Sequence, residues 1–312
     1  MLIALALIAL AILFYLLAIS ADIVVVSLRK LGKELGIRIY FLGFILGMFT
    51  SAPEMMIGLD TAVRGISTLA LGNLMGGIIV VLGLVLGASV MLNRSVATPS
   101  QRPPLGMIVL FLALPLALGF DGALSRAEGM TLVILYLALL YFIYRTGGSH
   151  ETAPKPTAGG RRSLQHLFFV LAGLVALIAL SDAILRITEF VLAHFGVSLF
   201  FVGMLVYAFG TNLPEIMVVL RAWRNHTREL SLSSLLGSAM ANVFVIGVVI
   251  FLAPVAVSIN NAYLSLAAVC GALFMAVLAF SRTGRRMVRA EGAALALIYL
   301  IFVFSQLWIE FF

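Results

Sequence analysis

Apolar runs long enough to cross a lipid bilayer recur along the whole chain. Hydrophobic residues make up 63% of the 312 residues, charged residues only 11%, and the mean hydropathy is +1.17. This composition excludes an ordinary soluble domain, and apolar runs of about 18 to 25 residues are typical of transmembrane helices. We therefore predict an all-α polytopic membrane protein with ten spans, at 2–28, 38–63, 67–92, 104–121, 127–145, 165–193, 198–221, 230–254, 260–281 and 289–309.

The first apolar run resembles a cleavable secretory signal, because small residues near Ser20 look like a cleavage site. No Lys or Arg precedes this run, however. The matching segment of the second half also continues as one helix through the equivalent point. We interpret 2–28 as an uncleaved first span.

Basic residues lie in short clusters between the apolar runs. If the N-terminus is placed outside, all but three of the 20 Lys and Arg residues fall on inside loops, and the exceptions are Arg64, Arg126 and Arg186. This bias follows the positive-inside rule and predicts that both termini lie outside. The net charge of +7 then reflects membrane topology and gives no reason to expect nucleic-acid binding. Short loops favour a prokaryotic inner (plasma) membrane.

A stretch rich in Gly, Pro and Thr at 147–163 has the composition of a linker. It divides the chain into two five-helix units, 1–146 and 164–312, and lies on the cytoplasmic side of the predicted topology. Because five is an odd number, the second unit must enter the membrane from the opposite side. The two units are therefore predicted to be inverted repeats with a shared site near the midplane.

The sequences of the two halves align with each other. Gly43 pairs with Gly203 at an offset of 160, whereas Glu54 pairs with Glu215 at an offset of 161. The first half has therefore lost one residue between Gly43 and Phe49.

One short stretch occurs in both halves, as FTSAPE at 49–54 and GTNLPE at 210–215. A proline inside a helix removes the hydrogen bond to the carbonyl four residues earlier, here that of Phe49 or Gly210. In a bilayer such a carbonyl needs a partner, which a bound cation can supply. A single copy would also fit a structural proline kink, but two copies at matching places favour a functional site.

The side chains of this stretch supply further oxygen atoms. Thr50 and Glu54 are four residues apart and face one side of a helix, and Thr211 and Glu215 repeat this spacing. Carboxylates, hydroxyls and carbonyls form an all-oxygen set that suits hard cations such as Ca2+ and is poor for zinc or copper. We assign the metal ligands to Glu54, Glu215, Thr50 and Thr211.

A second element follows each stretch, and it differs between the halves. Ser238 and Asn242 are four residues apart and complete the oxygen set of the second half. Gly77 and Val81 occupy the equivalent positions of the first half and carry no side-chain oxygen. The predicted site is therefore chemically lopsided. Small residues such as Gly76 also have a plain structural interpretation, because they allow close helix contact.

The blocks GMFTSAPEMM with ALGNLMGG, and AFGTNLPEIM with LLGSAMANV, resemble the alpha-1 and alpha-2 repeats of the calcium/cation antiporter superfamily, in particular its sodium/calcium exchanger branch. The alpha-1-like motif covers 43–83 and the alpha-2-like motif covers 203–247. The resemblance implies a ten-helix inverted-repeat fold in which Ca2+ and Na+ compete at neighbouring sites, and in which the long first and sixth helices slide. The cation-binding residues that it carries over are Thr50, Ser51, Glu54, Thr211, Asn212, Glu215, Ser238 and Asn242.

Three functional hypotheses remain open. The first is a secondary antiporter that exports Ca2+ or a similar divalent cation in exchange for Na+ or H+. The second is a non-transporting cation sensor or scaffold of the same fold, suggested by the missing ligands at Gly77 and Val81. The third is a channel. Spacing does not choose among Ca2+, Mn2+ and Mg2+. With two central carboxylates, we expect electroneutral exchange of two monovalent ions per divalent ion.

Three aspartates are weaker candidates. Asp22 and Asp182 recur on the predicted sliding helices, and each is equally well explained as a carboxylate bonded to a neighbour near the end of a span. Asp60 lies beyond Glu54 and fits either a vestibule or an interface. No nucleophile constellation or phosphate-binding glycine loop is present, so we expect neither an enzyme nor a cofactor. The partners are inorganic cations and the lipid bilayer, and the oligomeric state stays open.

Overall fold

The computed structural model describes residues 2–35, 48–49, 51–92, 95–97, 105–146, 160–224, 232–282 and 286–312. These residues are almost entirely helical. The helices are α1 (Leu2–Glu34), α3 (Ala52–Val63), α4 (Ser67–Ile79), α5 (Leu86–Leu92), α6 (Leu105–Leu118), α7 (Arg126–Thr146), α8 (Arg161–Phe195), α9 (Leu199–Val202), α10 (Ala208–Thr211), α11 (Leu213–Arg224), α12 (Leu232–Leu252), α13 (Asn261–Arg282) and α14 (Arg289–Phe311).

Eight segments in the described part of the chain are long and apolar enough to span a membrane, and 105–121 is a shorter apolar helix. They correspond to nine of the ten predicted spans. The predicted second span, 38–63, lies only partly within the described residues, which include α3. The predicted linker likewise falls mostly outside them, at 147–159. Helix α8 begins at Arg161, so the last residues assigned to the linker are helical.

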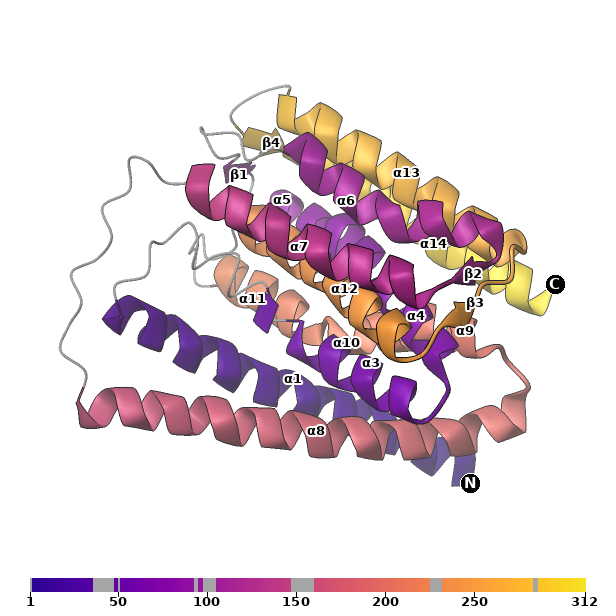
Figure 1. Cartoon of the computed structure of the whole chain (residues 1–312), viewed down its shortest axis with the longest axis horizontal. Helices are drawn as coiled ribbons and strands as arrows, with labels where there is room; N and C mark the ends of the chain where they lie inside the picture. Colours follow the sequence, from indigo (N-terminus) through magenta and orange to yellow (C-terminus); the bar gives the residue numbers. More distant parts are fainter. Residues whose placement is uncertain are drawn as a thin grey trace.

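Two short strand pairs reveal the inverted symmetry. Strand β1 (Ser95–Ala97) pairs antiparallel with β4 (Arg286–Val288), and β2 (Ala123–Leu124) pairs with β3 (Val255–Ala256). The pairs lie at opposite ends of the bundle, whereas both chain termini lie at the same end (Figure 1). Each pair joins a strand of one repeat to a strand of the other. The all-α, inverted-repeat prediction is confirmed.

Close glycine contacts follow the same symmetry. Residues 126–129 and 289–292 both read RAEG, and in each copy the glutamate bonds to the backbone just before the helix: Glu128 Oε2 accepts from the Ser125 N–H (2.6 Å) and Glu291 Oε2 from the Val288 N–H (2.8 Å). The two glycines then lie against the other repeat. A Cβ at Gly87 would come within 2.8 Å of the Gly292 carbonyl, and one at Gly247 within 2.9 Å of the Gly129 carbonyl. Backbones therefore touch at both crossings, as is common between membrane helices.

Two π-helical segments interrupt the helices near the repeated stretch. Segment η3 (Gly203–Tyr207) falls where the second half has one more residue than the first, and η1 (Val80–Val85) follows α4. A π turn holds one residue more than an α turn, so it accommodates a single extra residue without breaking the helix. The offset between the halves therefore has a structural explanation at η3.

The long helices α1 and α8 form a pair that is set apart from the rest of the bundle (Figure 1). They are joined near the start of α8, where the Ser163 hydroxyl donates to Glu34 (2.5 Å) and His166 lies 3.7 Å from the same carboxylate. The buried apolar residues divide accordingly into two clusters. The larger cluster fills the bundle, and the smaller joins α1 and α8 to the bundle through residues such as Ile57 and Tyr207.

Candidate cation-binding site

In both copies of the repeated stretch, a residue with non-helical dihedrals directly precedes a helix, and in the second copy it separates two helices. Ser51 precedes α3 with φ −83° and ψ 14°, and Asn212 separates α10 from α11 with φ −87° and ψ 9°. These dihedrals are close to the bridge region, outside the α-helical range. The prolines then fall in the first turn of the following helix, where the missing N–H costs nothing. The sequence analysis placed each proline in a helix interior, whereas the structure places each one in the first turn of a helix, α3 or α11.

One predicted carbonyl is only partly free. The backbone N–H of Asn212 donates to the carbonyl of Gly210, so this carbonyl already has one partner. The carbonyl of Phe49 as a cation ligand stays a prediction. Thr50, a predicted ligand, lies outside the described residues.

The two glutamates are buried in the first turns of α3 and α11. Glu54 is 0% exposed and Glu215 is 2% exposed. They lie close enough for their charges to repel each other. Two buried carboxylates near each other are costly unless a cation or protons neutralise them.

Hydroxyl groups link the two helix breaks. The Oγ atoms of Ser51 and Ser238 are 2.8 Å apart, and Ser238 Oγ donates to Glu215 Oε1 at 3.3 Å. Ser51 Oγ also reaches the Ser238 carbonyl at 3.3 Å. Ser51 belongs to the first repeat and the other two residues to the second, so the repeats meet at these side chains.

Several buried oxygen atoms face no donor. Among the described residues, no hydrogen-bond donor pairs with either Glu54 oxygen, nor with Oδ1 of Asn212 or Asn242. The Nδ2 groups of both amides donate to carbonyls, Asn212 to Ala208 (2.8 Å) and Asn242 to Leu74 (3.4 Å). These bonds place each Oδ1 on the opposite side of its amide. Buried acceptors without donors are rare, and a cation is one explanation for them.

Gly77 is where the two repeats compete for space. A Cβ at Gly77 would come within 2.6 Å of Asn242 Nδ2 and 3.3 Å of Asn212 Nδ2. Two amides therefore occupy the volume that a side chain at residue 77 would need. Gly76 lies against the backbone carbonyl of Met204, so the structural interpretation of this glycine, close helix contact, fits the structure.

Two buried residues near the site escaped the sequence analysis. Asn73 is 0% exposed, and its Oδ1 accepts from Thr211 Oγ1 at 3.3 Å. Thr211 Oγ1 also contacts the Tyr207 carbonyl at 2.9 Å. Asn73 could have been found, because an amide in the middle of an apolar span is a functional signal by itself. Tyr207 could not have been found in this way, because its spacing from the other candidate residues does not set it apart.

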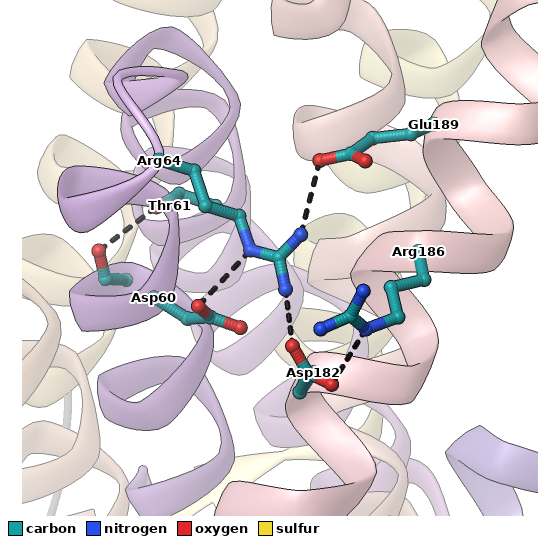
Figure 2. Close-up of polar contacts among 7 residues, drawn as sticks. Asp60, Thr61, Arg64, Asp182, Arg186 and Glu189 are labelled. Atoms are coloured by element: carbon teal, nitrogen blue, oxygen red, sulfur yellow. Dashed lines mark hydrogen bonds and ion pairs between the residues drawn. The ribbon is translucent and has the colours of Figure 1, made fainter.

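Asp60 and Asp182 belong to an ionic cluster around Arg64 (Figure 2). The guanidinium bonds to Asp60 (3.1 Å), to Glu189 (3.3 Å) and to Asp182, which also accepts from Arg186 (2.8 Å). The hydrogen bond that Arg64 donates to Asp60 raises the pKa of Arg64 above its usual value, so Arg64 remains charged. The interpretation of Asp182 as a carboxylate bonded to neighbours fits this geometry. Asp22 is half-buried on α1.

The candidate site contains no soft ligands. Within the described ranges, no group of three or more His, Cys, Asp or Glu residues could hold a metal ion. The structure instead joins buried carboxylates, hydroxyls and amides through shared contacts; these side chains belong to Glu54, Glu215, Ser51, Thr211, Asn212, Ser238 and Asn242. Such a donor set is suited to hard cations.

Inverted repeats of membrane helices that break beside buried carboxylates define a class of secondary cation transporters. Comparison with known proteins narrows the class. The model of the family described as "Sodium/calcium exchanger protein" matches residues 5–145 and 165–308. The chain belongs to this family of integral membrane antiporters, which are transporters and not enzymes.

Relatives and solved structures agree with this assignment. The putative antiporter CaxA of Alkalimonas amylolytica is 28% identical over 301 residues, which cover 90% of this chain and 92% of CaxA. The sodium/calcium exchanger MaX1 of Methanosarcina acetivorans is 22% identical, with 91% and 93% covered. A solved structure of the sodium-calcium exchanger NCX_Mj superposes with a TM-score of 0.72 at 20% identity, over 97% of this chain and 99% of that one, and shows that the fold is shared.

Proposed function

We propose that the protein exports Ca2+ or a similar divalent cation in exchange for Na+ or H+, through a midplane site centred on Glu54 and Glu215. The observation that carries the proposal is the pair of glutamates, buried in the matching helix breaks of two inverted repeats. An isolated pair of buried carboxylates would be strongly destabilising. A divalent cation neutralises both.

The surrounding atoms support the same proposal. The Glu54 oxygens and the amide oxygens of Asn212 and Asn242 are buried acceptors with no donor among the described residues. Flexible sets of carboxylate, hydroxyl and amide oxygens suit Ca2+, whereas Mg2+ requires a more regular octahedron. The names of CaxA and MaX1, a putative antiporter and a sodium/calcium exchanger, point in the same direction.

The proposed topology follows from the charge distribution. Both termini lie on the outer side of a prokaryotic inner membrane, and the linker at 147–163 lies in the cytoplasm. Scanning single cysteines with a membrane-impermeant thiol reagent tests this orientation. Residues 126 and 65 are expected to react from outside and residue 150 only after permeabilisation.

The function is tested by uptake of radiolabelled Ca2+ into proteoliposomes that contain the purified protein. An antiporter takes up Ca2+ only when the vesicles are loaded with Na+ or are acidic inside. Gradient-independent flux would indicate a channel instead. Repeating the assay with an imposed Na+ gradient at constant pH, and then with a pH gradient without Na+, separates the two coupling ions.

The alternative is a sensor or scaffold of the same fold. It is favoured by one observation, the absence of side-chain oxygens at Gly77 and Val81. A sensor would bind Ca2+ to the purified protein, as measured by calorimetry, without any flux in the vesicles. The same preparation thus distinguishes the two functions.

A further inference from the structure

An apolar groove lies between α1, α14 and the segment 199–213. Its volume is about 650 Å3, and its floor consists of buried residues from all three elements, namely Leu10, Phe14, Phe201, Gly210 and Tyr299. Among the described residues that line it, only Tyr299 carries a polar side-chain group. The groove therefore has almost nothing to offer a polar ligand.

The rim of the groove is exposed. Leu7, Val206, Phe209 and Leu307 line it and have exposed fractions between 38% and 48%. All four belong to segments that are long and apolar enough to span a membrane. Since the exposed apolar side chains of such segments face the hydrocarbon of the bilayer, the groove is filled from the lipid and not from water.

The groove is as long as one leaflet is thick. Along α14 it extends from Phe311, at the end of the helix, to Tyr299, in the middle of it. A rise of about 1.5 Å per residue makes this stretch about 18 Å long, and half of the hydrocarbon core is roughly 15 Å thick. Trp308 stacks on Phe312 at the outer end, with ring centroids 4.8 Å apart. Because aromatic side chains are typical of the membrane–water interface, the groove begins at the interface and ends near half depth.

These dimensions distinguish between two apolar occupants. A transmembrane helix of a second copy would need a contact surface along about 30 Å of hydrocarbon, nearly twice the length of the groove. An acyl chain of one leaflet needs only the length that is present. A flexible chain of methylene groups also fills an irregular groove, whereas an empty groove would forfeit the dispersion contacts of its floor.

We propose that one acyl chain of a phospholipid occupies this groove, from the leaflet on the side where both termini lie. The end of the chain then lies against Phe14 and Gly210. Phe14 itself packs on Gly210 so closely that a Cβ there would come within 2.5 Å of its ring. The lipid is thus placed against the backbone directly before Thr211. The inference goes beyond the proposed function, since it needs neither a bound cation nor transport.

The test uses a phosphatidylcholine that carries a photoreactive diazirine near the end of one acyl chain. It is mixed at a small fraction into vesicles of palmitoyl-oleoyl phosphatidylethanolamine and phosphatidylglycerol that contain the full-length protein. Cross-linked peptides are quantified by mass spectrometry. Ala11→Phe narrows the groove, because Ala11 lines it and is exposed. Ala272→Phe is the matched control, since Ala272 is an exposed alanine of α13 that does not line the groove.

In the wild type, labelling of Gly210, Leu213 and Val303 is expected to exceed labelling of the exposed side chains of α7. Ala11→Phe should lower the labelling of the groove about tenfold, because the chain must then fit into an overpacked space. Ala272→Phe should keep the wild-type labelling of the groove. If Ala11→Phe does not fold, Ala11→Leu, which adds less volume, must show a smaller loss at the same residues.

Three results would overturn the inference. Equal labelling of the groove and of α7 would show ordinary boundary lipid only. Wild-type labelling in the folded Ala11 variant, or an equal loss in Ala272→Phe, would show that the chain does not lie in the groove. An unlabelled groove in a protein that is dimeric by light scattering would assign the groove to a second copy.

Discussion

The two repeats share a backbone but not a chemistry. Each has a helix break with a glutamate in the next turn, a strand paired with the other repeat, and a glycine crossing. The element after the break differs, since α4 presents Gly77 where α12 presents Ser238. Topology imposes the shared helix break and its glutamate, because the breaks of both inverted repeats must lie near the midplane of the membrane. Side chains near the pseudo-two-fold axis differ between the repeats, because the side chains of both repeats must fit into the same small volume.

Gly77 and Asn242 illustrate that competition. The amide of Asn242 occupies the space next to Gly77, so a larger residue in one repeat requires a smaller one in the other. The lopsided site is therefore a packed arrangement and not merely a site with ligands missing. Substitutions at the shared and at the differing positions test which of these features matter for transport.

The largest expected effect concerns what the repeats share. Glu54→Gln and Glu215→Gln should each abolish gradient-driven Ca2+ uptake, because each removes one of the two central charges while keeping the side-chain shape. Uptake of radiolabelled Ca2+ into proteoliposomes measures the loss. Glu291→Gln at the start of α14 is the matched control, since this glutamate caps a helix by accepting from the Val288 N–H and is not one of the proposed ligands. Wild-type uptake in either central variant would refute the site assignment.

The next largest effect is expected at Gly77, where the first repeat has a glycine and the second has Ser238. Gly77→Ser should weaken Ca2+ binding about tenfold, because the new Cβ displaces the Asn242 amide, and overpacking a core costs about 1–3 kcal/mol. Calorimetric titration of the purified variant measures this. Adding Asn242→Ala should restore the space, though not the lost amide ligand. A gain in Ca2+ affinity for Gly77→Ser alone would contradict the packing argument.

The combination of Gly77→Ser with Val81→Asn tests whether the first repeat has lost alkali-ion ligands. We expect stronger inhibition of Ca2+ uptake by Na+ in a double variant that folds, because two oxygen ligands are added. Thermal unfolding of the purified protein is the control for the clash with Asn242. Unchanged Na+ inhibition in a stable double variant would show that these positions do not set Na+ affinity.

Much of this arrangement was predictable from the sequence, and the rest was not, for physical reasons. Hydropathy, the positive-inside bias and the doubled stretch predicted the spans and the central glutamates, because membrane insertion and inverted topology act on single segments. Pairs such as Gly77 with Asn242 and Asn73 with Thr211 join distant segments, and no spacing reports them. The ion pair between Asp182 and Arg64 also joins distant segments, so spacing does not report it. The repeated RAEG at 126–129 and 289–292, in contrast, is a signal that the sequence carries by itself.

A smaller effect concerns the two ends of the bundle. Arg64 ties the end of α3 to α8 on the side where both termini lie, the predicted outer side (Figures 1 and 2). Arg64→Gln should release this contact and favour the state open to that side. We expect the half-saturating Ca2+ concentration to fall about fivefold outside and to rise inside, since apparent affinity follows the population of the competent state.

Opposite changes on the two sides distinguish this effect from simple destabilisation. They are measured by initial rates in vesicles of defined orientation, with Ca2+ varied on one side at a time. Arg126→Gln is the control, because Arg126 is exposed at the start of α7 and forms no ion pair within the described ranges. Changes of the same sign on both sides would exclude a role for the cluster in alternating access.

The last prediction concerns the net charge that each exchange cycle moves across the membrane, for which we expect the smallest effect on the transport rate. With Val81 apolar and Asn242 neutral, the central site holds the two negative charges of Glu54 and Glu215. One divalent cation neutralises them, and returning the bare site through a low-dielectric membrane is costly, so two monovalent ions should accompany the return. Exchange is therefore expected to be electroneutral, with no Ca2+-dependent current on a solid-supported membrane.

Asn242→Asp sharpens this expectation, because it adds one negative charge with almost no change in volume. Three monovalent ions should then accompany the return, and each cycle should carry one net positive charge inward. The variant is expected to show a Ca2+-dependent current that the wild type lacks, recorded at a pH high enough to ionise the new carboxyl. A wild-type current would refute the charge count itself. A variant that exchanges without current would show instead that residue 242 does not share the ions bound by the two glutamates.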